Sequence, residues 1–338
     1  MKLIPFKLRL KQPQSTHRNS SGSTNLIKNR VSRVVAVAGL STLLSACQNG
    51  LPSSTDVLNM VTPKSGFTLY QDIKYGSDPR QRLDIYVPTA ENLAELKASG
   101  KELPGPSQPL PTVFFVHGGS WEMGNKSDYL FIGQSLTDAG YIAVLINYRL
   151  APEHPFPDYV NDTAQALKFT RENIQDYGGS ADKILALGHS AGAFNIVSAL
   201  DDPQFTQRFD LPDQPVMSVV GIAGPYGYDY RKFESRTAFP PNSDPKDIMP
   251  VYNTRANPVP HLLLTAEKDT LVGKNNTTEM AQSLREQGGE VEVGVIKGAS
   301  HTTVIAAMAN RLKFIADTRT VVLDYLRRQL EKDQSLNP

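Results

Sequence analysis

A serine in a glycine-flanked turn is the first candidate for chemistry in this 338-residue chain. Ser190 lies in the pentapeptide GHSAG at 188–192, between a short apolar run at Ile184–Leu187 and the helix-forming stretch AFNIVSAL. A serine at such a strand–turn–helix junction has a strained backbone, and small neighbours relieve the crowding. The N–H groups and positive end of the following helix can stabilise an oxyanion. The spacing therefore predicts a nucleophilic serine.

A nucleophilic serine needs a base that removes its proton, and two histidines follow Ser190 in the chain. His261 opens an apolar run and would lie at the amino end of a strand, the wrong end for catalysis. His301 lies in the loop after the apolar run Val291–Ile296. Because reactive groups collect at the carboxyl ends of parallel strands, we expect His301 to be the general base.

The base in turn needs a carboxylate that orients its ring, and two acids follow the apolar run His261–Leu264. Asp269 lies in the loop after this run, and Glu267 lies two residues earlier, where the strand could still continue. Asp269 is favoured and Glu267 remains the alternative. Asp269 could also simply cap the helix expected near 275–287.

Backbone donors for an oxyanion are expected on two segments. The glycine-rich turn HGGSW at 117–121 follows the apolar run Val113–Val116 and can present its N–H groups, with Ala191 N–H as a further donor. We expect His117 to position this loop and not to act as the base. Trp121, the only tryptophan, is either a wall of the substrate pocket or part of the core.

Apolar runs of strand length alternate with segments of helix length. The strands are expected at Val113–Val116, Ile142–Ile146, Ile184–Leu187, Val216–Ile222, His261–Leu264 and Val291–Ile296. The helices are expected near 127–139, 158–177, 191–200, 275–287 and 303–331. This order predicts an α/β fold with a mostly parallel sheet and helices on both faces. Phe67–Tyr75 and Gln81–Val87 flank a turn and add an antiparallel hairpin at one edge. Residues 89–111 predict a surface insertion with one short helix.

Composition and charge exclude several classes of protein. The chain holds 35 Lys and Arg against 34 Asp and Glu. This net charge of +1 gives no indication of the basic surface that binds nucleic acid. The single cysteine excludes an internal disulfide and a zinc site built from cysteines. Serine chemistry needs no metal and no cofactor, and none is expected. The charge is uneven, since residues 1–46 hold eight basic and no acidic side chains.

The N-terminal segment has the parts of an export signal. A basic flank precedes the apolar run VVAVAGLSTLL at 34–44, which is too short for a membrane-spanning helix. The run ends in Leu-Ser-Ala-Cys at 44–47, which resembles the bacterial lipoprotein box. This resemblance implies that Cys47 is lipidated and becomes the mature N-terminus. Gln48, in place of the aspartate that retains lipoproteins at the inner membrane, favours the outer membrane.

Three parts of the chain are therefore expected. Residues 1–46 form the leader, residues 47–64 form a polar tether, and residues 65–333 form one α/β catalytic domain. Within this domain, residues 224–257 lack clear periodicity and are expected to form a small lid or pocket wall. The candidate substrate contacts in this lid are Tyr226, Tyr228 and Phe239. Each of them could instead pack within a surface loop.

Four motifs together resemble the α/β-hydrolase-fold serine esterases. The nearest likeness is to the hormone-sensitive-lipase-like carboxylesterases and, more closely, to the formamidase and feruloyl-esterase-like group. The motifs are HGGSW at 117–121, YRLAPEHPFPD at 148–158, GHSAG at 188–192, and Asp269-Thr-Leu-Val with His301. Ser120 and Trp121 replace the third glycine of the lipase-like motif, which fits the formamidase-like group better. The helical N-terminal cap of the lipase-like relatives has no room in this chain.

The resemblance implies roles for particular residues. Ser190 would be the nucleophile, His301 the general base and Asp269 the orienting acid. The oxyanion hole would be lined by Gly118, Gly119 and Ala191. The expected activity is hydrolysis of small acyl or aryl carboxylic esters through an acyl-enzyme, in a protein that is lipid-anchored in the cell envelope. The alternatives are an amidase such as a formamidase, with the same three residues, and a non-catalytic binding protein on this scaffold.

Overall fold

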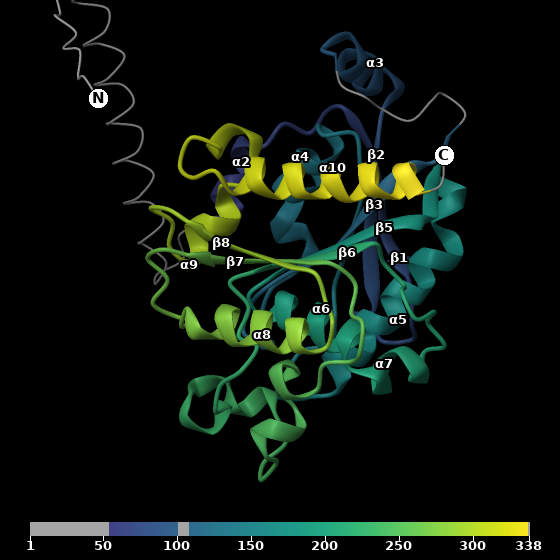
Figure 1. The fold of residues 1–338 in the computed structure, drawn as a ribbon. Coiled ribbons are helices and arrows are strands. Elements are labelled where there is room, and N and C mark those ends of the chain that lie inside the picture. Colours follow the sequence, from purple (N-terminus) through teal and green to yellow (C-terminus); the bar gives the residue numbers. More distant parts are fainter. Residues whose placement is uncertain (1–53, 101–107, 337–338) are drawn as a thin grey trace, which may run out of the picture. The chain divides into compact units, whose positions relative to one another are not determined.

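The computed structural model describes residues 54–100 and 108–336, and within these residues eight strands form one sheet (Figure 1). The strands are β1 (Phe67–Lys74), β2 (Arg82–Pro88), β3 (Leu110–Val116), β4 (Ile142–Ile146), β5 (Gly179–His189), β6 (Ser218–Ile222), β7 (His261–Ala266) and β8 (Val291–Ile296). The α-helices are α2 (Ser54–Val61), α3 (Ala90–Ala98), α4 (Leu130–Thr137), α5 (Asp158–Asn173), α6 (Ala191–Asp201), α7 (Pro203–Arg208), α8 (Asn275–Glu286), α9 (His301–Ala306) and α10 (Thr318–Leu336). Short 3-10 helices lie between them, namely η1 (Lys126–Tyr129), η2 (Ile174–Tyr177), η3 (Tyr230–Lys232), η4 (Glu234–Ala238), η5 (Pro245–Asp247), η6 (Pro250–Tyr252) and η7 (Asn310–Leu312).

The order of the strands places the candidate residues along one edge of the sheet. The strands lie in the order β1-β2-β4-β3-β5-β6-β7-β8. β1 and β2 pair antiparallel, β2 pairs antiparallel with β4, and every further pair is parallel. The mostly parallel sheet with an antiparallel edge hairpin is therefore confirmed. Because β3, β5, β7 and β8 run in the same direction, the turns at their carboxyl ends meet at the same edge.

Helices cover both faces of the sheet, as expected. In Figure 1, α4 and α10 lie on one side of the sheet, and α5, α6 and α8 lie on the other. This double cover explains why β4 and β6 are buried at every position and read as continuous apolar runs. The outermost strand β8 is half exposed along most of its length.

The C-terminal segment differs from its expected form. One helix was expected over residues 303–331, but the chain forms α9, the short η7 and then α10. Every residue from Val304 to Met308 is buried. A long surface helix buries one stripe and exposes the other, so this fully buried stretch does not fit one. Helix α7 was not predicted from the sequence. It begins with Pro203, and the side chain of Asp202 caps it by accepting a hydrogen bond from the N–H of Gln204.

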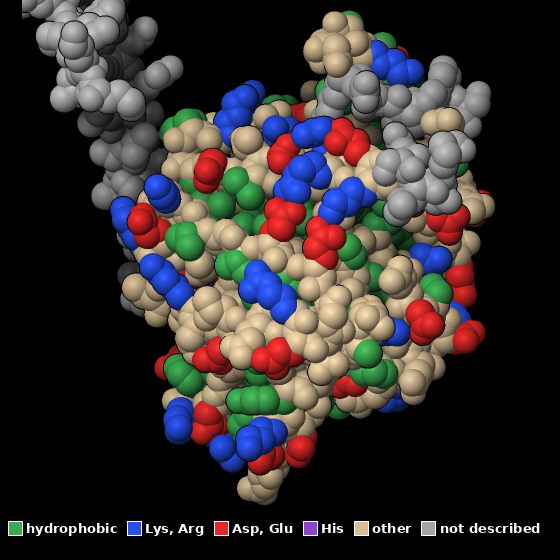
Figure 2. Space-filling model, viewed as in Figure 1, with side chains coloured by type: hydrophobic (Ala, Val, Ile, Leu, Met, Phe, Trp, Pro, Cys, Tyr) green, Lys and Arg blue, Asp and Glu red, His purple; other side chains and the backbone are tan. Residues whose placement is uncertain are grey.

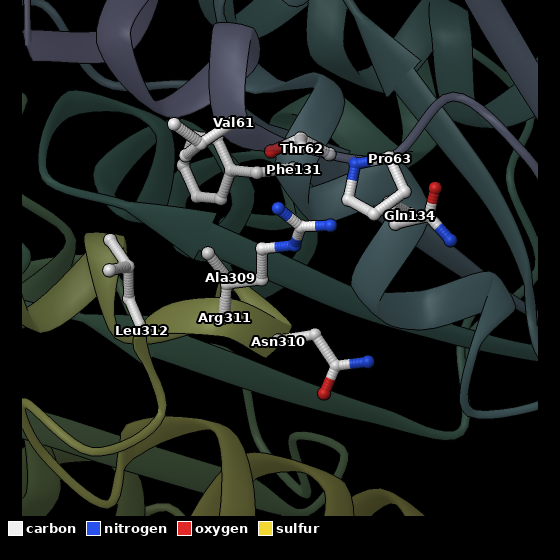
Figure 3. A pocket seen from close by; sticks show the side chains of 9 residues that line it. All are labelled: Val61, Thr62, Pro63, Phe131, Gln134, Ala309, Asn310, Arg311 and Leu312. Atoms are coloured by element: carbon white, nitrogen blue, oxygen red, sulfur yellow. The ribbon is translucent and has the colours of Figure 1, made fainter.

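Helix α2 lies inside the segment expected to be a tether. Leu58 is buried, and the side-chain amide of Asn59 donates to the main-chain carbonyl of Ser127 at 2.7 Å. At the end of the helix, Val61 lines a small pocket beside Phe131 of α4 (Figure 3). The folded part of the chain thus begins upstream of the boundary expected at residue 65. The leader and Cys47 lie outside the described residues.

Charged side chains of both signs mix on the surface around α10. Figure 2 shows Lys and Arg interspersed with Asp and Glu over this face. On α10, Arg327 pairs with Asp324 and Glu331, and Arg328 reaches Glu292 of β8. None of the described helices is long and apolar enough to cross a membrane.

Candidate functional site

Ser190 lies between β5 and α6 in a backbone conformation that L-residues seldom adopt, with φ at 54° and ψ at −124°. The flanking glycines make this turn possible. A Cβ on Gly188 would lie 2.5 Å from the carbonyl oxygen of Gly192, and a Cβ on Gly192 would collide with the carbonyl oxygen of Val116. Since main-chain atoms have little freedom to move, both positions require glycine. The strained turn presents Ser190 at the carboxyl edge of the sheet.

The structure brings Ser190, His301 and Asp269 into one chain of hydrogen bonds. The hydroxyl of Ser190 donates to Nε2 of His301 at 2.9 Å, and Nδ1–H of His301 donates to Oδ2 of Asp269 at 2.8 Å. Asp269 follows β7, and His301 follows β8 as the first residue of α9. A serine, an imidazole and a carboxylate in this order can move a proton from the hydroxyl and stabilise the imidazolium that results.

Of the two carboxylates after β7, Asp269 faces the histidine. Burial raises the pKa of the Asp269 carboxyl, but hydrogen bonds from His301 and from the N–H of Val272 outweigh this effect, so the pKa lies below its ordinary value. The carboxylate therefore stays ionised beside the imidazole. The carboxylate of Glu267 instead accepts a hydrogen bond from the N–H of Gly298 at 2.8 Å. The geometry therefore favours Asp269 over Glu267.

His117 supports the glycine turn from within the core. Its ring is fully buried and stacks on Tyr148 with a centroid separation of 4.4 Å. Its Nδ1–H donates to the carbonyl of Gly118 at 2.7 Å, and the hydroxyl of Tyr148 donates to the carbonyl of His117 at 3.1 Å. Burial lowers the pKa of His117 to about 4, so the ring is neutral at neutral pH. These contacts suit a positioning role for His117.

The three residues expected to line an oxyanion hole lie on the two segments that border Ser190. A Cβ on Gly118 would lie 3.1 Å from the Cβ of Ser190. Gly119 has a φ of 128°, and a Cβ there would collide with the carbonyl oxygen of Met123. Ala191 is the first residue of α6, where N–H groups have no partner within the helix. The glycine turn and the start of α6 therefore both border Ser190, as an oxyanion hole would require.

His261 lies away from this site, as expected. It opens β7, at the opposite end of the strand from Asp269. Its Nδ1 lies 2.6 Å from the carbonyl oxygen of Val259, and its Nε2 lies 3.0 Å from Oδ2 of Asp201. Both side chains of this pair are buried, so His261 has a structural role.

Three of the four aromatic side chains considered for the substrate pocket are buried, which favours the core alternative for Trp121 and packing within the segment for Tyr226 and Phe239. Trp121 is 2% exposed, and its Nε1–H donates to the side chain of Asn195 at 2.8 Å. Phe239, also 2% exposed, packs edge-on against Trp121, and Tyr226 is fully buried. Only Tyr228 of the four is half-buried.

Sequence patterns do not predict two further long-range contacts. Nε2 of His189 lies 3.1 Å from the main-chain carbonyl oxygen of His301, which is 112 residues away in the chain. The hydroxyl of Thr237 donates to the carboxylate of Glu122, which joins the 224–257 segment to the glycine turn. Neither pair of residues is close in sequence, so no local pattern points to these contacts. Among residues 54–100 and 108–336, no group of three or more His, Cys, Asp or Glu side chains is arranged to hold a metal ion.

The sequence is similar to those of several esterases. Residues 103–215 match the BD-FAE family model. The chain is 28% identical to esterase LipC of Mycobacterium tuberculosis over 255 residues. This aligned region covers 68% of this chain and 58% of that protein. The chain is 25% identical to the probable isoprenylcysteine alpha-carbonyl methylesterase ICME of Oryza sativa subsp. japonica over 278 residues. This aligned region covers 75% of this chain and 63% of that protein. The chain thus spans about six tenths of the length of these curated relatives.

The structure is similar to solved esterase structures. The hyperthermophilic esterase from the archaeon Pyrobaculum calidifontis superposes with a TM-score of 0.63 at 20% sequence identity, over 93% of this chain and 98% of that one. The mostly parallel sheet and the helices on both of its faces agree with this likeness. This chain therefore has the α/β-hydrolase fold.

Proposed function

We propose that the protein is a serine hydrolase of carboxylic esters. Oγ of Ser190 attacks the acyl carbon while Nε2 of His301 takes its proton, and Asp269 stabilises the imidazolium. The oxyanion that forms accepts hydrogen bonds from backbone N–H groups of the glycine turn and of Ala191. Collapse of this intermediate expels the alcohol, which takes the proton from His301 and leaves an acyl ester on Ser190. Water then attacks this ester with His301 as the base, and the acid leaves.

One observation carries this proposal, namely the hydrogen-bond chain from Ser190 through His301 to Asp269. A serine with only a structural role has no need of a strained backbone, of two obligatory glycines or of an ordered imidazole beside it. The similarity to proteins named as esterases and methylesterases supports ester substrates.

We propose small acyl or aryl esters as the substrate class. The 224–257 segment folds as the short 3-10 helices η3 to η6, and its aromatic residues Tyr226 and Phe239 are buried. Phe233 and Tyr252 of this segment are exposed, but none of its helices is longer than five residues, so no extended apolar helix face is available for a long acyl chain. An amidase such as a formamidase would use the same three residues, so amide substrates belong in the same experiment.

We further propose that the protein is exported and anchored in the cell envelope by a lipid on Cys47. The support comes from the sequence alone, because Cys47 lies outside the described residues. Mass spectrometry of the mature N-terminal peptide tests this, with a diacylglyceryl group on Cys47 as the expected result. An unmodified Cys47 inside a longer peptide would reject the anchor. A Cys47→Ser variant should lose membrane association.

The proposed activity is tested with p-nitrophenyl esters from acetate to palmitate. We expect turnover that falls with acyl chain length and is lost in Ser190→Ala, by about 10⁴-fold or more. Ser99→Ala, at the exposed C-terminus of α3, is the matched control and should keep full activity. Hydrolysis of anilides but not of esters would reassign the protein as an amidase. Folded protein that turns over neither class would favour a binding protein.

A further inference from the structure

His189, the residue before Ser190, is a buried histidine that the proposed reaction does not use. It ends β5, and 5% of its surface is exposed. Its Nε2 lies 3.1 Å from the main-chain carbonyl oxygen of His301. Because a carbonyl oxygen only accepts hydrogen bonds, Nε2 carries a proton and donates it in this contact.

The surroundings of His189 keep it from acting as a second base. Its Nε2 donates to the carbonyl of His301, and its basic nitrogen, Nδ1, is buried; the ring centroids of the two histidines lie 5.0 Å apart with a tilt of 44°. Burial, together with the charge that His301 carries when protonated, lowers the pKa of His189 to about 3. His189 is therefore neutral at neutral pH, and no second cation lies beside His301 when it takes the proton from Ser190.

The loop that carries His301 has mainly local support. The N–H of Ser300 donates to the hydroxyl of Thr303 at 2.8 Å, and the hydroxyl of Ser300 accepts from the N–H of Thr303, so α9 begins with a capping box. The N–H of Lys268 donates to the carbonyl of Ala299 at 2.8 Å, which joins this loop to the turn after β7. These bonds fix the shape of the loop, but they do not tie it to β5, the strand that carries the nucleophile.

The contact of His189 with His301 supplies this missing connection. The ring of His301 is also held by Ser190 and Asp269, but its bond to Ser190 exists only while that hydroxyl is free. When Ser190 carries an acyl group, the hydrogen bond from its hydroxyl to Nε2 is lost. The contact from His189 is made to the main chain and involves no reacting atom. It therefore persists through acylation and deacylation.

We propose that His189 is a positioning residue, whose Nε2–H holds the main chain of His301 at the distance from Ser190 that proton transfer requires. This inference rests on the proposed function of Ser190 and His301. A displacement of about 1 Å at a reacting group can cost about 10²-fold in rate, so one hydrogen bond that sets this distance has a measurable effect on turnover.

The test compares variants of the full chain that keep or remove the donor. His189→Phe keeps a planar ring without a donor, and His189→Gln places an amide N–H where Nε2 was. For p-nitrophenyl acetate, we expect His189→Phe to lower kcat by about 10- to 100-fold with KM within about threefold of the wild type. His189→Gln should stay within about threefold of the wild-type kcat. His154→Gln, on a half-exposed histidine that bonds to Asp158, is the control and should behave as the wild type.

A second measurement, by proton NMR, detects a change in the position of His301 and does not depend on turnover. The Nδ1 proton of His301, hydrogen-bonded to Asp269, gives a downfield proton NMR resonance. We expect a sharp resonance in the wild type and in His189→Gln, and a shifted or broadened one in His189→Phe. If His189→Phe does not fold, His189→Met replaces it, because a flexible apolar side chain fills the same space without a donor.

The outcomes separate this inference from the proposed function. A wild-type kcat in His189→Phe with an unchanged resonance would overturn the positioning role. Equal losses of kcat in the Phe and Gln variants would overturn it too, since they would show that the donor is irrelevant. If the wild type hydrolyses no ester but the resonance still depends on the donor at residue 189, the ester proposal fails and the positioning role stands.

Discussion

Asp269 affects the proposed reaction through His301, because its carboxylate accepts the Nδ1–H of the imidazole at 2.8 Å. An ionised carboxylate there selects the tautomer that leaves Nε2 free to take the proton of Ser190. The lowered pKa of Asp269 keeps it ionised well below neutral pH. In the proposed mechanism Asp269 therefore orients the imidazole and balances its charge, and it takes no proton itself.

Replacing Asp269 by Asn tests this role. We expect kcat to fall by about 10⁴-fold because the amide favours the wrong tautomer of His301. Glu267→Gln is the matched control, since the Gln oxygen can still accept from the N–H of Gly298. Its steady-state kcat should stay within about threefold of the wild type, because a hydrogen bond at an exposed position contributes little. Equal losses in both variants would contradict the assignment of Asp269.

At this scale the sequence indicates the chemistry but not the packing. Ser190, His301 and Asp269 could each be singled out because strand ends and glycine spacing mark them in the chain. The roles of Trp121 and Phe239 could not, because an aromatic residue in an irregular segment fits a pocket wall and a core equally well. Only the tertiary packing, which leaves each 2% exposed, decides between them.

At the scale of the elements, the packing of helix α2 on the domain gives a testable prediction about stability. Leu58 is 4% exposed, while Met60 on the same helix is 77% exposed. Leu58→Ala should lower the free energy of unfolding by about 2–3 kcal/mol, because it removes buried methyl groups and leaves a cavity. Met60→Ala should change it by less than about 0.5 kcal/mol. Urea unfolding of both variants checks this, and equal effects would show that α2 does not pack on the domain.

The contact between α10 and β8 depends on pH. The hydrogen bond from Arg328 holds the pKa of Glu292 below its ordinary value. A carboxyl whose pKa is lowered by folding stabilises the protein above its ordinary pKa of 4.5, and this contribution is lost as the pH falls through the lower folded value. The side chains are about 38% exposed, so solvent screening keeps the contribution below about 1 kcal/mol.

Glu292→Gln tests this linkage. The variant should melt slightly below the wild type at neutral pH, and the difference should shrink as the pH falls below 4.5, because protonation of Glu292 also removes the ion pair in the wild type. Thermal melts between neutral pH and acid measure the difference. A difference that grows towards acid would have the wrong sign for this explanation.

For the whole molecule, periodicity predicts the sheet well and the connections less well. The runs Ile142–Ile146 and Val291–Ile296 coincide with β4 and β8, because short apolar segments between turn residues have few alternatives to a buried strand. The break between α9 and α10 escapes prediction, because no glycine or proline lies in 303–317 to mark it. The contact of His189 with His301 joins the ends of β5 and β8, which become near neighbours only when β6 and β7 pair between them.

The central claim is that Ser190 is the nucleophile activated by His301. A fluorophosphonate probe tests it most directly, because it reacts only with an activated serine, and mass spectrometry of the digested protein locates the adduct. We predict one adduct, on the peptide that carries Ser190, formed rapidly by folded wild-type protein and much more slowly by the Asp269→Asn variant. Folded protein that stays unlabelled, or that is labelled on a different serine, would contradict this account.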